Sequence, residues 1–172
     1  MKFTKILIFA LAFGFIHHFS AQEKAETVIA KAQKKAKAEN KNVMVFFHAS
    51  WCSWCRLMDK KMNLPETKNL FDNNFVFASL DVLERGEKEK LENPNGEKMM
   101  AQYGDKDAGL PFFVFLDSTG KVLDTSLNDL KENLGCPSTP EEITAFIAKL
   151  KKTSRLNDAQ LKVIQDVFAA KQ

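Results

Sequence analysis

The sequence predicts an α/β fold in which one mixed β-sheet is covered by helices. Short apolar runs at residues 43–49, 75–82 and 112–116 are too short for helices and indicate buried strands. Between these runs, apolar side chains recur at helical spacing. The chain has 172 residues, of which 45% are hydrophobic and 27% charged, and this suits one soluble globular domain.

The first 21 residues are typical of a secretory signal peptide. Lys2 and Lys5 precede an uncharged run of 11 residues, and the small residue Ala21 leads into polar sequence. At about 1.5 Å per residue the run falls short of a hydrocarbon core of about 30 Å, so a permanent membrane anchor is the weaker alternative. We therefore expect cleavage after Ala21, which leaves residues 22–172 as a periplasmic or secreted protein.

The remaining elements follow from apolar spacing and from turn or capping residues. We predict helices over residues 23–40, 56–62, 65–73, 97–102 and 137–152, and a last one starting at Asn157 or Asp158. After the strand at 112–116, residues 117–120 have turn composition, so residues 121–125 return as a hairpin strand. The last helix lies in a C-terminal extension, about residues 154–172, which we expect to pack on the same domain.

Charge gives no reason to expect a nucleic-acid partner. The formal net charge is only +3, and both signs are interspersed along the chain. Residues 84–98 alternate acids and bases, which is typical of a solvated face. An alternative is that this segment overhangs the functional site and selects partners.

Cys52 and Cys55 stand where the first apolar run meets the following helix. Unpaired N–H groups at a helix start favour an anion, so the Cys52 thiol should ionise below the pKa of about 8.5 of a free thiol. Cys55 lies nearly one turn later and can reach Cys52 to close a disulfide. The pair can therefore attack a disulfide through Cys52 and release the product through Cys55, provided that Cys52 is accessible to water.

Two other interpretations of the pair stay open. A zinc site would need His48 and Cys136 as further ligands, because the sequence has no second Cys-x-x-Cys. A purely structural disulfide would stabilise little, because so short a loop removes little entropy from the unfolded chain. We expect redox chemistry, with no bound metal or organic cofactor.

The sequence resembles the thioredoxin superfamily over roughly residues 25–152. The resemblance rests on VMVFFHASWCSWC at 43–55, on Leu110-Pro111, on FFVFLDSTGKVL at 112–123 and on the amphipathic helix that follows. Within the superfamily it is most similar to the exported bacterial branch with a WC-x-WC phrase, near the C-terminal domains of transmembrane reductant conductors. This resemblance implies a thioredoxin-like fold, with a mixed central sheet flanked by helices.

The resemblance also implies roles for individual residues. Cys52 resembles the attacking cysteine and Cys55 the resolving cysteine. Pro111 resembles the proline that stays cis beside the active site and keeps a substrate strand in register. Gly135 resembles the glycine that borders the substrate groove, so Cys136 would lie within reach of substrate rather than in the core.

Several further side chains are candidates for binding or tuning. Exposed indoles beside the cysteines would form an apolar rim for an extended polypeptide. The predicted substrate-binding residues are Trp51, Trp54, Leu110, Pro111 and Gly135. His48 and Cys136 are auxiliary candidates, although a histidine packed at the end of a strand and a cysteine acting as a small hydrophobe are the simpler interpretations.

Two positions depart from the family pattern. Phe46 stands six residues before Cys52, where thioredoxins usually have a buried acid that moves the proton of the resolving thiol. Ser53-Trp54 replaces Gly-Pro between the cysteines, and this dipeptide helps to set the reduction potential. The direction of electron flow is therefore not determined by the sequence.

We predict an exported thiol-disulfide oxidoreductase that reduces or isomerises disulfides of other exported proteins. A membrane or soluble redox partner would recycle the cysteine pair, and we expect a monomer that binds no nucleic acid. The alternatives are a non-catalytic peptide-binding module and a zinc-stabilised, chaperone-like domain.

Overall fold

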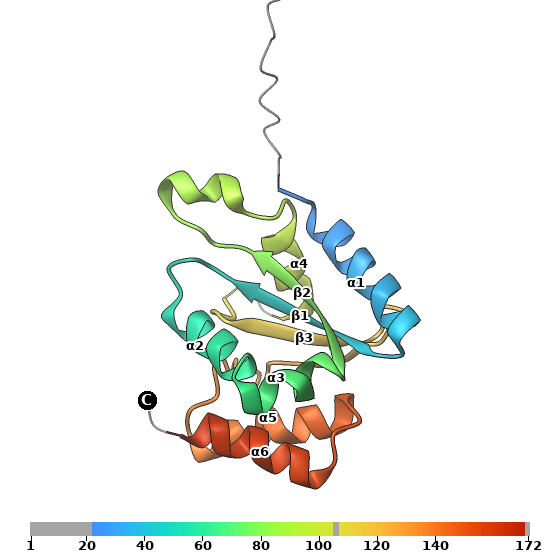
Figure 1. Cartoon of the computed structure of the whole chain (residues 1–172). Coiled ribbons are helices and arrows are strands. Elements are labelled where there is room, and N and C mark those ends of the chain that lie inside the picture. The colour runs from blue at the N-terminus through green and yellow to red at the C-terminus, as the bar shows by residue number, and fades with distance from the viewer. Residues whose placement is uncertain (1–21, 105–106, 171–172) are drawn as a thin grey trace, which may run out of the picture.

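The computed structural model describes residues 22–104 and 107–170 (Figure 1). The predicted signal peptide lies outside the described residues and stays a prediction. Four strands form one sheet in the order β2-β1-β3-β4. Their bounds are Asn42–His48 for β1, Phe75–Asp81 for β2, Phe112–Leu116 for β3 and Val122–Thr125 for β4. β1 pairs in parallel with β2 and antiparallel with β3, which in turn pairs antiparallel with β4, so the predicted mixed sheet is confirmed.

Helices surround the sheet. They are α1 (Ala25–Glu39), α2 (Ser53–Met62), α3 (Pro65–Asp72), α4 (Gly96–Tyr103), α5 (Pro140–Thr153) and α6 (Asp158–Ala169). A 3-10 helix, η1 (Gly86–Leu91), was not predicted. Thr139 and Asn157 begin α5 and α6 with capping boxes, in which side chain and backbone satisfy each other's hydrogen bonds. No helix among these described elements is long and apolar enough to cross a membrane.

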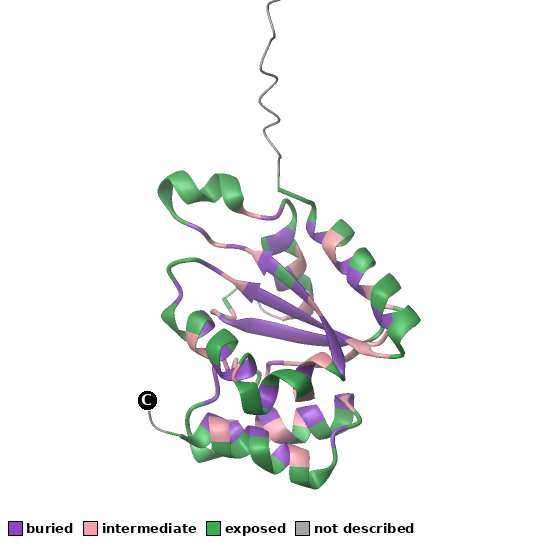
Figure 2. Ribbon diagram, viewed as in Figure 1, coloured by how far each residue is buried: buried purple, intermediate pink, exposed green. Residues whose placement is uncertain are grey.

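The core forms two layers, one on each face of the sheet (Figures 1 and 2). Side chains of β1 alternate between them: Met44 and Phe46 lie in one layer, and Val43, Val45 and Phe47 in the other. Helices α1 and α4 cover the second layer, and α2, α3, α5 and α6 cover the first. β1 is therefore buried on both faces, as its continuous apolar run predicts.

β2 differs from the expectation of a buried strand. It forms an edge of the sheet, and its Ser79 is exposed. Ser79 lies in the wall of a cleft beside Phe46, so its polar side chain can face water.

The C-terminal helix packs on the domain, on α5 and α3. Phe168 of α6 meets Phe146 of α5 with ring centroids 5.0 Å apart. Lys61, only 7% exposed, donates from Nζ to the Phe168 carbonyl at 2.7 Å, and its Nζ lies 5.4 Å from the Phe168 ring centroid. An otherwise unpaired carbonyl at the end of α6 is thus satisfied by a side chain from α2.

Candidate active site

Cys52 caps the start of α2, as the sequence predicts. Its Sγ is bonded to Cys55 Sγ, with the two Cα atoms 5.3 Å apart. Cys52 Sγ also accepts a hydrogen bond from the Cys55 backbone N–H at 3.1 Å. The unpaired N–H groups and the positive end of the dipole of a ten-residue helix are therefore directed at this sulfur, where they favour a thiolate once the disulfide is reduced.

The disulfide lies just beneath the surface. Cys52 is 4% exposed and Cys55 3% exposed, whereas the neighbouring Trp51 and Trp54 are 42% and 51% exposed. The accessibility that thiol-disulfide exchange requires at Cys52 is thus small but not zero. The exposed indoles agree with the predicted apolar rim.

A shallow groove of about 170 Å³ brings most of the predicted substrate-binding residues together. Its walls include Trp54, Leu110, Gly135 and Cys136. The Leu110-Pro111 peptide bond is cis, as the resemblance implies. Gly135 has φ +55°, and a Cβ placed there would lie 4.0 Å from Pro111 Cδ, so these two residues are neighbours. The groove is built as the resemblance implies, while the binding roles stay predictions.

Asn133 ties the two loops that border this groove, and sequence reasoning missed it. Its Nδ2 donates to the carbonyl oxygens of Pro111 at 2.9 Å and Gly109 at 3.2 Å. Its Oδ1 accepts from the Gly135 N–H at 3.2 Å. An asparagine in a loop carries no local signal for contacts made 22 and 24 residues away.

Glu84 is the other residue that the sequence did not reveal. It is only 7% exposed, and its Oε1 and Oε2 accept from the Ser50 N–H at 2.6 Å and the Ser50 Oγ at 2.7 Å. Lys88 Nζ donates to the same Oγ at 3.0 Å. Burial alone would raise the pKa of Glu84, but the hydrogen bonds from Ser50 and the nearby charges of Lys88 and His48 outweigh it and hold the pKa below the usual value.

Trp51 contacts the same segment. Its Nε1 donates to the Leu83 carbonyl at 2.7 Å, and the Arg85 guanidinium lies 3.9 Å from the Trp51 ring centroid. The expectation of a fully solvated face over residues 84–98 is therefore wrong at Glu84 and at Asn93, which are both buried. The start of the segment does lie beside Ser50 and Trp51, while the selection of partners by this segment stays a prediction. Because η1 is exposed throughout, the solvated interpretation does hold for residues 86–91.

A cleft of about 620 Å³ lies beside Cys55 and includes Phe46, His48 and Asp59 in its walls. Phe46, where thioredoxins usually have an acid, is buried and stacks on His48 with ring centroids 5.6 Å apart. His48 ends β1, and its Nδ1 lies 3.6 Å from Asp81 Oδ1. The histidine is therefore packed at the strand end, and the cleft beside the resolving cysteine holds polar groups although position 46 is apolar.

Cys136 belongs to the core as well as to the groove. It is a free cysteine, 5% exposed, and lies in the same core layer as Phe146. Burial raises the pKa of its thiol to about 11, a shift that the charge of Lys61 opposes and that of Glu142 reinforces. The expectation that it lies outside the core is thus wrong, because it is buried beneath the groove wall, and at neutral pH its thiol is protonated.

The zinc interpretation finds no ligand set in the part of the chain that the structure describes. Within residues 22–104 and 107–170, no three His, Cys, Asp or Glu side chains are placed to hold a metal ion. The cysteines of the Cys-x-x-Cys pair are bonded to each other.

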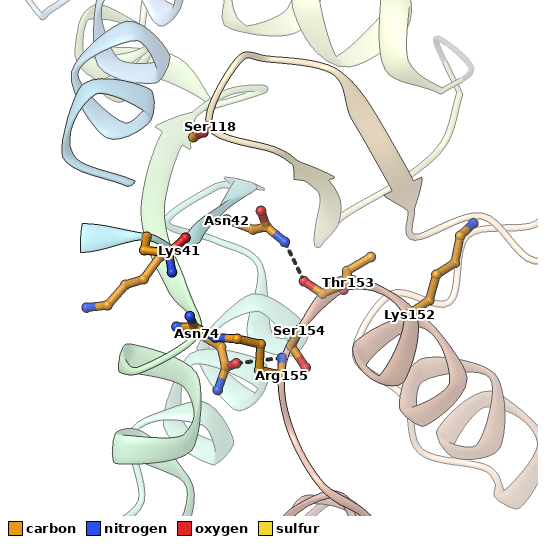
Figure 3. A pocket seen from close by; sticks show the side chains of 9 residues that line it. Lys41, Asn42, Asn74, Ser118, Lys152, Thr153, Ser154 and Arg155 are labelled. Carbon is orange, nitrogen blue, oxygen red and sulfur yellow. Dashed lines mark hydrogen bonds between the residues drawn. The ribbon is translucent and has the colours of Figure 1, made fainter. Parts of the chain in front are cut away.

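A polar pocket of about 290 Å³ lies elsewhere, between the start of β1 and the end of α5 (Figure 3). Asn42 Nδ2 donates to the Thr153 carbonyl at 2.7 Å, and the Arg155 N–H donates to Asn74 Oδ1 at 2.8 Å. These bonds join the start of β1 and the residue before β2 to the end of α5 and the segment that follows it. No cysteine lines this pocket, so we place the redox site at Cys52 and Cys55.

Comparison with known proteins gives one family and several similar structures. The family described as "Thioredoxin-like domain" matches residues 29–128, more than half of the chain. A disulphide isomerase from Xylella fastidiosa Temecula1 is 25% identical, with a TM-score of 0.52, covering 93% of this chain and 97% of that one. A DsbH oxidoreductase is 25% identical (TM-score 0.48), covering 79% of this chain and 85% of its own. The oxidised C-terminal domain of DsbD from Neisseria meningitidis is 22% identical (TM-score 0.45), covering 66% of this chain and 90% of its own.

Proposed function

Because the chain belongs to the thioredoxin-like domain family and carries a Cys-x-x-Cys disulfide at the start of a helix, we propose that it is an exported thiol-disulfide oxidoreductase that reduces or isomerises disulfides of other exported proteins. The fold and the cysteine pair support thiol-disulfide oxidoreductase chemistry in general. The observation that carries the proposal is the Cys52 sulfur at the N-terminus of α2, bonded to Cys55 and bordered by exposed indoles. The similarity to a disulphide isomerase over nearly the full length of both chains supports reduction or isomerisation.

Reduction proceeds in two exchanges. The Cys52 thiolate attacks one sulfur of a client disulfide, the client S–S bond breaks, and the leaving client thiolate takes a proton from water. Cys55 then loses its proton and attacks Cys52 Sγ, so the mixed disulfide breaks and the second client thiolate leaves. Two electrons pass to the client, and the pair ends as the disulfide seen here until a redox partner reduces it.

Isomerisation uses the first exchange only. After the mixed disulfide forms, a second client thiolate attacks the client sulfur that is bonded to Cys52. A different client disulfide then forms, and Cys52 leaves as the thiolate that the helix N-terminus stabilises, with no net oxidation or reduction.

An insulin-reduction assay with dithiothreitol tests the proposal. The wild-type protein should accelerate the reaction, and Cys52→Ser should not. Ser118→Ala, which changes the remote polar pocket, is the matched control and should behave as wild type. Equal rates for wild type and Cys52→Ser would overturn the redox function.

Trapping of clients tests the order of the two exchanges. Cys55→Ser should accumulate mixed disulfides between Cys52 and client proteins, detectable by mass spectrometry after acid quenching.

Export is tested by sequencing the N-terminus of the mature protein, which should begin at Gln22.

A non-catalytic peptide-binding module is the second candidate, and the low exposure of Cys52 favours it. Such a module would bind an extended peptide in the groove beside Trp54 without forming a covalent adduct. Peptide binding that is equal for wild type and Cys52→Ser, with no adduct from Cys55→Ser, would favour this candidate.

A further inference from the structure

The segment that follows β2 holds the loop that leads into Cys52. Given the redox activity proposed above, we propose that Glu84 is a positioning residue for thiol-disulfide exchange, whose buried carboxylate fixes the loop before Cys52 and restrains the reactivity of its sulfur. Five contacts join the segment Leu83–Lys88 to the two residues before Cys52, and Glu84 makes two of them.

Glu84 fixes both the backbone and the side chain of Ser50. One carboxylate oxygen accepts a hydrogen bond from the Ser50 N–H, and the other accepts one from the Ser50 hydroxyl. Rotation of either group would therefore break a short hydrogen bond. On the other side, Arg56 of α2 donates to the Ser50 carbonyl at 2.8 Å. The Cys52 N–H donates a hydrogen bond to the Ala49 carbonyl at 3.1 Å and so closes the turn before α2. The residues before Cys52 are thus held at once by the segment that follows β2 and by α2.

The same carboxylate places a negative charge against Ser50, which lies two residues before the attacking Cys52 in sequence. Because the effect of burial is outweighed by the hydrogen bonds from Ser50, which hold the pKa of Glu84 below the usual range, this carboxylate stays ionised at neutral pH. A second negative charge on Cys52 is disfavoured by such a neighbour, and it is favoured by the N-terminus of α2 and by the cations Arg56 and Lys88, which also contact Ser50. We infer that the Glu84 carboxylate offsets part of these favourable effects, which keeps Cys52 a better nucleophile and a poorer leaving group than it would be without that carboxylate.

The segment also holds the rim of the site. Leu83 accepts from the indole N–H of Trp51, and Arg85 stacks on its ring, so one short stretch of chain orients Trp51 and restrains Ser50. A change at Glu84 therefore acts on Cys52 through its neighbours and touches neither sulfur.

The test is Glu84→Gln, which keeps the side-chain shape and one oxygen acceptor but removes the charge. The rate of iodoacetamide alkylation of Cys52 in the reduced protein, followed by mass spectrometry against pH, gives its thiolate fraction. We expect about threefold more thiolate at a pH below the Cys52 pKa, that is, a pKa lower by about half a unit. The reduction potential, measured against glutathione, should become less negative. Glu87→Gln removes the same charge from an exposed position of η1 and is the matched control.

A Cys52 pKa that is lowered in Glu84→Gln and not in Glu87→Gln supports the positioning role. A Cys52 pKa that is unchanged or raised in Glu84→Gln, or equally changed in both variants, overturns it. Ser50→Ala removes only the hydroxyl partner of Glu84 and should give a smaller shift, which covers the case in which Glu84→Gln folds poorly. Alkylation does not depend on client turnover, so a wild-type protein inactive on insulin would overturn the proposed function while this profile still decides the role of Glu84.

Discussion

Reduction of the Cys52–Cys55 disulfide should lower the free energy of unfolding by about 1 kcal/mol. The bond closes a ring of four residues, 52 to 55, and the chain-entropy relation gives about 2 kcal/mol for a ring of this size. In the reduced folded protein, the thiolate at the N-terminus of α2 recovers about 0.3–1 kcal/mol. The difference leaves the oxidised form more stable.

This stability difference also predicts the reduction potential of the folded pair relative to that of an unstructured Cys-x-x-Cys. For a two-electron couple, about 1.4 kcal/mol corresponds to about 30 mV, so the folded pair should be more reducing than the unfolded pair by some 20–30 mV. A reductant needs that sign. An oxidant would need the reduced form to be the more stable one.

Urea unfolding followed by far-UV circular dichroism, with and without a phosphine reductant, measures the difference directly. The two curves should differ in midpoint and share nearly the same slope. Cys52→Ser cannot form the bond, so its midpoint should not respond to the reductant. A reduced form more stable than the oxidised form would refute the reasoning and would point to oxidation as the function.

Three further outcomes are expected. Because burial raises the pKa of the Cys136 thiol to about 11, alkylation at pH 8 should modify Cys136 far more slowly than Cys52 in the reduced native protein, and equal rates would contradict the raised pKa. Phe146→Ala should cost about 3–5 kcal/mol in urea unfolding, since this ring is fully buried between β3 and α6, and a cost below about 1 kcal/mol would show that the layer repacks freely. Burial would raise the pKa of Asp124, but hydrogen bonds from two lysines of α5 outweigh it and lower the pKa. A lowered folded pKa stabilises the protein above the unfolded value of about 4 and loses that effect as the pH falls, so Asp124→Asn should be less stable at pH 7 and should lose less stability below about pH 4.

Local patterns in the sequence were enough for most of the fold. β1 is recognisable in the sequence because it has five consecutive apolar residues in a run too short for a helix, and all five are buried in the structure. The last helix is predicted to start at Asn157 or Asp158, and α6 does begin at Asp158 with Asn157 as its cap. The helix before it is predicted from residue 137, whereas α5 begins three residues later at Pro140, after its cap Thr139. The position of Cys52 at the start of α2 follows in the same way, from an apolar run followed by residues that favour a helix.

Contacts between distant segments were decided only by the tertiary structure. Glu84 reaches Ser50 across 34 residues, and Asn133 reaches Pro111 across 22. Whether a glutamate among alternating charges is exposed or buried depends on which loop the sheet brings beside it, and spacing along the chain contains no such information. Cys136 is the same case, since its neighbours in sequence are polar or turn residues while the side chains that bury it come from other elements. The amino-acid order alone thus determined the redox pair and the helix beneath it, because both depend on neighbouring residues; the surroundings that tune the pair arose from packing between segments far apart in the chain.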